Sequence, residues 1–312
     1  MMSSTSAPTV APAPRPSTLK RMYLDGKLGA IALFLPPALL LFTLFVVIPL
    51  VNAADLSLYK WSGFGEVTEY VGLKNYATLL SHSVFHQSMW NSVKIILASI
   101  VLQIPLALGM ALLIYRKTPT NTLFRLVFLA PYILAEVASG LIWSFIFDGD
   151  YGISAQISSA LSIDPFYILA DKRFAFLAII TVIVWKYFGF HMMIFIAALQ
   201  AVPAELIEAA ELDGARPRQV IRYVKLPLVS HALKLSVFFA IIGSLQVFDI
   251  IIPLTNGGPS NSTHSIVSYL YTFGLTRLSV GYGSAVGVVL FIFCIFTAMT
   301  YKRLVIRDKG QS

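Results

Sequence analysis

Three ionisable side chains, Glu136, Lys186 and Asp249, stand inside long apolar stretches of this sequence. A charge in the middle of a bilayer is costly, so such a residue normally faces a cavity or pairs with another charge, and it marks a path for a polar solute. The same stretches hold hydroxyl and amide groups that could bind a solute by hydrogen bonds: Tyr132, Tyr187, Ser244 and Gln246. We therefore predict that these seven side chains line a translocation path.

A second interpretation of Glu136 and Lys186 is structural. Their opposite charges could simply pair, so that each neutralises the other and the pair holds two helices together. The two interpretations are compatible. Replacing Lys186 by Met would separate them, since unchanged transport with lowered stability would favour the structural role.

His82 and His86 are four residues apart and could share one face of a helix, as metal ligands do. No carboxylate or cysteine stands nearby at ligand spacing, so we expect surface histidines of a loop and no metal site. The sequence also lacks the enzyme patterns H-E-x-x-H, G-x-S-x-G and D-D-x-x-D, and the phosphate-binding pattern G-x-x-x-x-G-K-[ST]. We therefore predict that this chain is not an enzyme and binds no cofactor.

The composition is that of a polytopic membrane protein. Of the 312 residues, 57% are hydrophobic and only 12% are charged. The net charge is +8, but no soluble segment gathers the basic residues, so nucleic-acid binding is not expected. A helix that crosses the hydrocarbon core needs about 20 apolar residues. Six stretches meet this test and predict an all-α fold: Ile31–Val51, Ser92–Tyr115, Leu126–Phe147, Phe174–Leu199, Ala232–Leu254 and Ser284–Tyr301.

Polar tails flank these stretches and set the domain organisation. The first residues are rich in Ser, Thr, Ala and Pro, which predicts a disordered tail over residues 1–28. The apolar run that follows Lys27 is long enough to span, so we expect no cleaved signal peptide. The membrane domain is predicted over residues 29–304, with a second short tail over residues 305–312.

The distribution of Lys and Arg predicts the orientation. Cytoplasmic loops are enriched in these residues. With six spans, sixteen Lys and Arg fall on the side of the two termini, and six fall on the opposite side: Lys60, Lys74, Lys94, Lys172, Arg173 and Arg277. We therefore predict that both termini are cytoplasmic, as is the loop between the fourth and fifth spans.

That loop, residues 204–228, is unusually charged. From Glu208 to Val229 the sequence reads EAAELDGARPRQVIRYVKLPLV. Strong helix formers after Pro203 predict a helix that ends at the Asp213-Gly214 turn signal. A second helical pattern runs from Ala215 to Lys225 and stops at Leu226-Pro227. The loop is thus predicted to be a helix-turn-helix and not a flexible connection.

The stretches EAAELDGA (208–215) and VKLPL (224–228) resemble the EAA loop of the inner-membrane permease subunits of ABC importers. Three further segments are similar to the carbohydrate-uptake permeases: the first span with FLP at residues 34–36 and IPL at residues 48–50, VGLKNY at residues 71–76, and LTNGGP at residues 254–259. The resemblance implies the type I permease fold with six spans and an ATPase-coupling role for seven residues: Glu208, Ala209, Ala210, Asp213, Gly214, Leu226 and Pro227.

The resemblance also implies the partners and the function of the chain. The expected assembly holds a second homologous permease subunit, a dimer of ATPases that carries ATP and Mg²⁺, and an extracytoplasmic solute-binding protein, in the inner membrane of a bacterial cell. The substrate expected for the family is a sugar, here a di- or oligosaccharide, with monosaccharides and glycerol phosphates close behind. A secondary transporter or a channel for a small polar solute would also explain the spans and the buried charges, but not the coupling loop.

Overall fold

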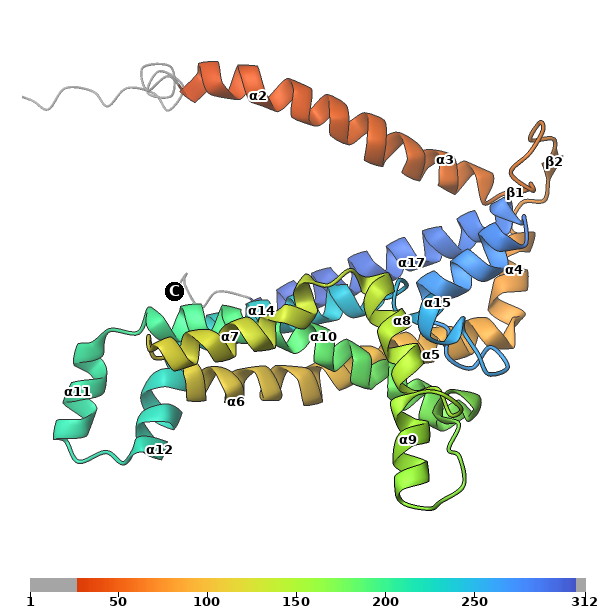
Figure 1. The fold of residues 1–312 in the computed structure, drawn as a ribbon. Helices are drawn as coiled ribbons and strands as arrows, with labels where there is room; N and C mark the ends of the chain where they lie inside the picture. The colour runs from red at the N-terminus through yellow and green to blue at the C-terminus, as the bar shows by residue number, and fades with distance from the viewer. Residues whose placement is uncertain (1–26, 307–312) are drawn as a thin grey trace, which may run out of the picture. The chain divides into compact units, whose positions relative to one another are not determined.

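The computed structural model describes residues 27–306, and most of them are helical (Figure 1). The chain divides into two compact units between Asn52 and Ala53. The predicted tails lie outside the described residues except at their inner ends. There, Lys27 and Leu28 begin the first described helix, and Val305 and Ile306 end a π-helical turn.

The first unit is one long apolar helix. It consists of α2 (Lys27–Phe42), a π-helical turn (Thr43–Val47) and α3 (Ile48–Leu56), which runs on past the division. The apolar part, Gly29–Leu56, has 28 residues and would span about 42 Å at 1.5 Å per residue. It contains the predicted first span, so this helix is long enough to cross a membrane.

A short hairpin and a small helix follow in the second unit. Strand β1 (Tyr59–Lys60) pairs antiparallel with β2 (Glu69–Tyr70), and helix α4 (Lys74–Ser81) comes next. The amide of Asn75 donates hydrogen bonds to the carbonyl oxygens of Ser57 and Tyr59, at 2.8 and 2.9 Å. The VGLKNY segment therefore ties the hairpin to the start of α4.

Three continuous helices of the second unit are long and apolar enough to span a membrane. They are Ser83–Ile114, formed by α5 (Ser83–Ala98), a π-helical turn (Ser99–Gln103) and α6 (Ile104–Ile114); α10 (Lys172–Gln200); and α17 (Val280–Tyr301). They contain the predicted second, fourth and sixth spans, apart from Tyr115 at the end of the second. The first of them begins nine residues before the predicted start, at Ser83, because α5 extends beyond its apolar part.

The predicted third span is wrong in one respect, because it is not a single helix. Helices α7 (Pro119–Ile133) and α8 (Glu136–Ile146) meet at an angle of 97°. Leu134 and Ala135 between them have extended backbone, with ψ of 146° and 142°. The two residues are apolar like their neighbours, so composition alone did not reveal the break.

The predicted fifth span is interrupted as well. Helix α14 (Ser230–Leu245) ends nine residues before the expected boundary at Leu254, and the chain turns before α15 (Ile251–Thr255). On its other side α14 is bent by 65° from the preceding helical segment, Pro217–Leu228. Counting each bent pair as one span gives six spans together with the four continuous helices.

The remaining helices are short connections. They are α9 (Ile153–Ala160), a 3-10 turn (Ile168–Ala170), α11 (Ala204–Leu212), α12 (Pro217–Val220), a π-helical turn (Ile221–Lys225), α13 (Leu226–Leu228), α16 (Ile266–Tyr269), a π-helical segment (Leu270–Thr276) and the π-helical turn Lys302–Ile306. Among the described residues the only strands are β1 and β2.

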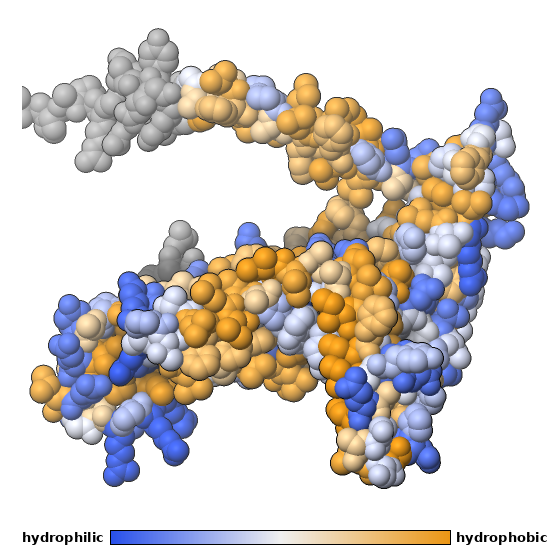
Figure 2. All heavy atoms as spheres, in the orientation of Figure 1, coloured by the Kyte–Doolittle hydropathy of each residue, from blue (hydrophilic) through white to orange (hydrophobic). Residues whose placement is uncertain are grey.

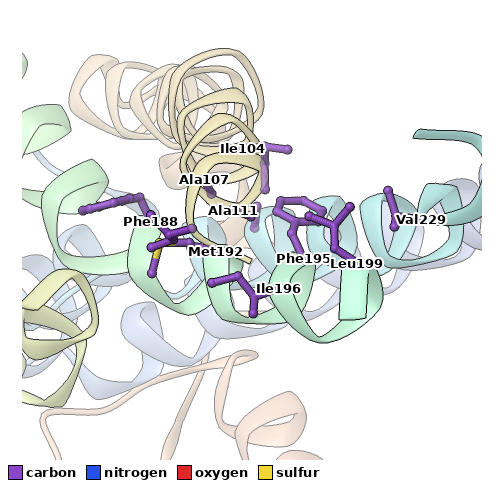
Figure 3. Packing of buried hydrophobic residues seen from close by; sticks show 11 residues of the cluster. Ile104, Ala107, Ala111, Phe188, Met192, Phe195, Ile196, Leu199 and Val229 are labelled. Atoms are coloured by element: carbon purple, nitrogen blue, oxygen red, sulfur yellow. The ribbon is translucent and has the colours of Figure 1, made fainter. Parts of the chain in front are cut away.

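The largest buried cluster lies where α6 packs along α10 (Figure 3). Ala107 and Ala111 of α6 are fully buried, and their small side chains let the two backbones approach closely. Met192 and Phe195 of α10 fill the same seam. Figure 2 shows the outside of this region as a broad apolar band, with polar side chains at the end that carries α11 and α12. The band is the surface expected of helices that face lipid.

Gly189 allows α7 to lie directly against α10. A Cβ atom added at Gly189 would overlap the carbonyl oxygen of Phe128 in α7, whereas one added at Gly109 in α6 meets nothing within 4 Å. We expect Gly189→Ala to force the helices apart and to lower the free energy of unfolding by about 1–3 kcal/mol. Gly109→Ala, the matched control, should be neutral or stabilising. Thermal unfolding in detergent measures both, and equal unfolding temperatures for the two variants would contradict this packing.

Candidate functional site

A cleft of about 450 Å³ opens among α7, α8, α10, α14 and the chain that follows α14. Six of the seven side chains predicted for a translocation path line it: Tyr132, Glu136, Tyr187, Ser244, Gln246 and Asp249. They come from four separate parts of the chain, and the most distant two are 117 positions apart (132 and 249). The fold therefore brings these polar side chains close together. The lining contains two carboxylates, Glu136 and Asp249, and no Lys or Arg.

Lys186, the seventh predicted residue, is not part of the lining. Its side chain is 1% exposed and points into the protein. The ammonium group donates to the carbonyl oxygens of Leu134 (2.6 Å) and Pro131 (3.3 Å) and lies 3.5 Å from the hydroxyl of Ser139. These partners belong to the last turn of α7, the break and the first turn of α8.

The suggested ion pair of Lys186 with Glu136 is not formed. Within residues 27–306 the one ion pair joins Lys60 and Glu69, with nitrogen and oxygen 3.2 Å apart. Glu136 instead accepts a hydrogen bond from the hydroxyl of Tyr187. The residue types suggested an ion pair between Lys186 and Glu136. Lys186 instead donates to backbone carbonyl oxygens, and the sequence alone does not show which carbonyl groups lack a partner.

The bond from Lys186 explains how a sharp break can exist in this helix. At the end of a helix the last carbonyl groups have no partner within the helix, and they carry partial negative charge. Inside a bilayer an unpaired carbonyl costs several kcal/mol, so irregular backbone needs partners from the protein. Lys186 supplies both a donor and a positive charge. It therefore stabilises the bend that turns α8 away from α7.

At the break after α14, a backbone carbonyl group also accepts a hydrogen bond from a side chain. The hydroxyl of Ser265 donates to the carbonyl oxygen of Val247 at 2.6 Å. Gln246 and Asp249 lie on either side of that residue and line the cleft. Both breaks thus place polar side chains at the cleft, and at each break a side chain donates a hydrogen bond to a backbone carbonyl group.

Several lining residues were not predicted. Ser99 and Gln103 come from the π-helical turn between α5 and α6, and the hydroxyls of Ser99 and Ser244 are 3.1 Å apart. The side-chain oxygen of Gln103 is buried and has no hydrogen-bond partner in the described part of the chain. An amide in the middle of an apolar stretch is the signal that could have found Gln103.

Aromatic rings form one wall of the cleft. The rings of Tyr132 and Phe190 are stacked with centroids 4.9 Å apart, and Tyr187 meets Tyr132 edge to face at 6.2 Å. Flat aromatic faces beside carboxylates and amides can hold a solute that carries hydroxyl groups around an apolar ring face. The geometry suits binding and passage of such a solute.

Beyond the C-terminal end of α10 the charged loop forms the predicted helix-turn-helix. Helix α11 ends at Leu212 and is followed by Asp213, and Gly214 has φ of +80°, a left-handed conformation that glycine adopts without strain. The amide of Ala215 donates to the carbonyl oxygen of Ala210 at 2.9 Å, which closes the turn. The second helical piece begins at Pro217, with Arg216 before it, and not at Ala215 as the pattern suggested.

The second half of the loop is anchored to the bundle. Lys225 is 9% exposed, and its ammonium group donates to the hydroxyl of Tyr115 at 2.9 Å. Gln200, the last residue of α10, donates to the carbonyl oxygen of Tyr115 at 2.8 Å. Tyr115 follows directly after α6, so the loop is joined to the ends of both α6 and α10. Neither Tyr115 nor Lys225 was among the predicted residues.

The residues predicted for coupling remain accessible. Glu208, Ala209, Asp213, Gly214 and Pro227 are exposed, while Ala210 and Leu226 are half-buried. Leu212, at the end of α11, is 90% exposed, which is unusual for a leucine that has no partner surface. The loop therefore offers an exposed helix on a fixed base.

His82 and His86, considered above as metal ligands, each form a hydrogen bond within the protein. His82 Nδ1 lies 2.6 Å from the hydroxyl of Tyr269, and His86 Nε2 lies 2.7 Å from the carbonyl oxygen of Leu80. Burial, with a smaller contribution from Arg277, lowers the pKa of His82 below its ordinary value. The lowered pKa favours the neutral imidazole, and His82 forms a structural hydrogen bond with Tyr269.

Comparison with known proteins places these features in a family. Residues 103–308 match the model of the binding-protein-dependent transport system inner membrane component. The chain is 31% identical over 93% of its length to the sulfoquinovosyl glycerol transport system permease protein SmoG of Agrobacterium fabrum, of which 94% is covered. It is 31% identical over 92% of its length to the trehalose/maltose transport system permease protein MalF of Thermococcus litoralis, of which 96% is covered.

A solved structure shares the fold. The chain superposes with a TM-score of 0.80 on a chain of the bacterial alginate ABC transporter, crystallised in complex with an alginate pentasaccharide-bound periplasmic protein. The match covers 95% of this chain and 99% of that chain at 20% sequence identity. It shows that the fold is that of an ABC importer permease.

Removing the ammonium of Lys186 tests its role at the helix break. In Lys186→Met the carbonyl oxygens of Leu134 and Pro131 lose their partner, so we expect the free energy of unfolding to fall by about 1–3 kcal/mol. Thermal unfolding of the purified chain measures this. Lys74→Met, at an exposed position on α4, is the matched control and should unfold like the wild type. Wild-type stability of Lys186→Met would contradict the role given to Lys186.

Proposed function

This chain belongs to the family of binding-protein-dependent transport system inner membrane components, and we propose that it forms the translocation path of an ATP-driven ABC importer for a di- or oligosaccharide. Membership makes it a multi-pass protein of the inner membrane that transports together with a binding protein. The proposal adds the substrate class, the residues of the path and the way in which ATP hydrolysis reaches them.

The observation that carries the proposal is the exposed helix α11 on its fixed base. A helix held at both ends can transmit a displacement, whereas a flexible loop would absorb it. The base consists of Lys225, Tyr115 and Gln200, which join the loop to α6 and α10. We therefore assign Glu208 and its neighbours on the loop to contact with an ATPase that binds ATP and Mg²⁺.

The mechanism follows from the way in which α10 connects the two sites. When ATP closes the ATPase dimer, α11 moves with it, and the loop displaces the ends of α6 and α10. Tyr187 and Phe190, near the middle of α10, then shift relative to the opposite wall of the cleft at Gln246 and Asp249. The cleft opens alternately to the two sides of the membrane, as in a rocking permease.

The proposed substrate follows from the lining of the cleft. Glu136, Gln246 and Asp249 can accept or donate hydrogen bonds around the rim of a sugar, and Tyr132 and Phe190 offer flat surfaces for its faces. The absence of Lys and Arg from the lining disfavours an anion at this position. Relatives named for trehalose/maltose and for diacetylchitobiose support a di- or oligosaccharide.

The assembly proposed for this chain has four kinds of member. A second, homologous permease completes the path as a heterodimer, two ATPase subunits bind the two coupling loops, and a solute-binding protein delivers the sugar from outside. The distribution of Lys and Arg supports an orientation with both termini and the coupling loop in the cytoplasm. A secondary transporter or a channel would work without ATP, and it would not explain why α11 is exposed on a fixed base.

Reversing the charge of Glu208 tests the coupling. The carboxylate is exposed on α11, so Glu208→Lys should leave folding intact and repel the ATPase surface that accepts it. We expect ATP-driven uptake of saccharide into proteoliposomes that hold the complete transporter to fall at least about tenfold, the effect of losing about 1.4 kcal/mol of interaction.

Glu66→Lys is the control, since it makes the same charge change at an exposed position remote from the loop, and it should keep uptake near the wild-type rate. The amount of each variant in the membrane is measured in parallel. Undiminished uptake by Glu208→Lys would refute the coupling role. Uptake by the wild-type chain alone, without ATPase or ATP, would refute the importer proposal itself.

A further inference from the structure

A second cavity, of about 630 Å³, lies at the end of the second unit remote from α11 and α12, between the beginnings of α5 and α10. Three cations line it: Lys94 of α5, and Lys172 and Arg173 at the start of α10. The lining contains no Asp or Glu. Only six Lys and Arg fall on this side of the predicted membrane, so half of them converge on one cavity from segments far apart in the sequence.

None of these three cations forms an ion pair or donates a side-chain hydrogen bond to any group among residues 27–306. The ammonium group of Lys94 lies 5.1 Å from the ring centroid of Phe176 and 6.0 Å from that of Trp90. The nearest acid in the sequence, Asp171, uses its carboxylate to cap α10, where it accepts from the amides of Arg173 (2.8 Å) and Phe174 (3.1 Å).

The far wall of the cavity is held in place by buried hydrogen bonds. Asn91 is 1% exposed, and its amide donates to the carbonyl oxygens of Ser262 (2.7 Å) and His264 (3.0 Å). Its side-chain oxygen accepts from Gln87 at 3.0 Å. The loop that carries Ser260 and Ser262 is therefore fixed against α5, and the cavity is a formed site.

The depth of the cations indicates which anion they meet. Lys94 lies two residues inside the apolar stretch that begins at Ser92, and Lys172 and Arg173 directly precede the apolar stretch that begins at Phe174. This is the level of the lipid headgroups, where Trp and basic side chains of membrane proteins concentrate. The phosphates of phospholipids lie at this depth.

The surface below the cations is apolar and exposed. Trp90, Lys94 and Leu97 share one face of α5 at positions i, i+4 and i+7, and Trp90 and Leu97 are 55% and 51% exposed. On α10, Leu177 follows Arg173 by one turn and is 54% exposed. A cationic site with an apolar strip beneath it matches a headgroup and its acyl chains. An acidic protein surface would match the cations alone.

We propose that this cavity binds the phosphate headgroup of an anionic phospholipid of the outer leaflet, with Lys94, Lys172 and Arg173 around the phosphate and the acyl chains along Leu97 and Leu177. The proposal rests on the membrane location and the proposed orientation of the chain, and not on the sugar specificity or the coupling described above. The bound lipid would hold the starts of α5 and α10 together on the side where solute enters.

The test places purified full-length variants in nanodiscs of phosphatidylcholine, with and without phosphatidylglycerol. Native mass spectrometry then measures how much phosphatidylglycerol each variant retains. Each basic residue near a membrane surface contributes about fivefold to binding of anionic lipid, so the triple variant Lys94→Gln, Lys172→Gln, Arg173→Gln should bind about a hundredfold more weakly. Lys94→Arg, which keeps the charge, should bind as the wild type does.

The matched control neutralises the other three cations of this side, in Lys60→Gln, Lys74→Gln, Arg277→Gln, and should change retention less than about twofold. An equal loss in this control would show that general surface charge attracts the lipid, and would overturn the site. Wild-type retention by the first triple variant would do the same. Displacement of the lipid by soluble glycerol phosphate at equal concentration would assign the cavity to a small free anion. Unchanged lipid retention with lost docking of the binding protein would assign it to an acidic protein surface.

Discussion

The structure depends on the need to satisfy backbone carbonyl groups where membrane helices are broken. Lys186 binds the carbonyl oxygens of Pro131 and Leu134 at the end of α7, and Ser265 binds that of Val247 after α14. Without such partners neither break could persist in a bilayer. With them, the chain places Glu136 at the start of α8, and Gln246 and Asp249 after α14, around one cleft.

Helices α6 and α10 connect the cleft with the helix-turn-helix loop at residues 204–228. Helices α6 and α10 pack against each other through small and large apolar side chains (Figure 3). Tyr115 follows the last residue of α6, Gln200 is the last residue of α10, and Lys225 anchors the loop there through its bond to Tyr115. Close packing makes this seam stiff. In the proposed mechanism, a displacement of α11 would reach the aromatic wall of the cleft through one continuous packed element, α10.

Much of this architecture follows from sequence patterns, and the exceptions have a common physical origin. Apolar length predicts the spans, and Asp213-Gly214 predicts the turn of the loop. The 97° bend at Leu134 and Ala135 could not be predicted, because both residues are as apolar as a continuous helix requires. Lys186 suggested a carboxylate partner, whereas its actual partners are backbone oxygens that become available only because of that bend. Six of the seven side chains predicted for the path do line the cleft.

The most direct test of the account is whether a transported sugar occupies the cleft. Gln246 is exposed and lines it, and Cys294, the only cysteine of the sequence, can be replaced by Ser to remove background reaction. In the assembled transporter, Gln246→Cys should react with a small polar maleimide, and the imported saccharide should slow that reaction. Equal reaction rates with and without the saccharide, in a variant that still imports it, would show that the path lies elsewhere.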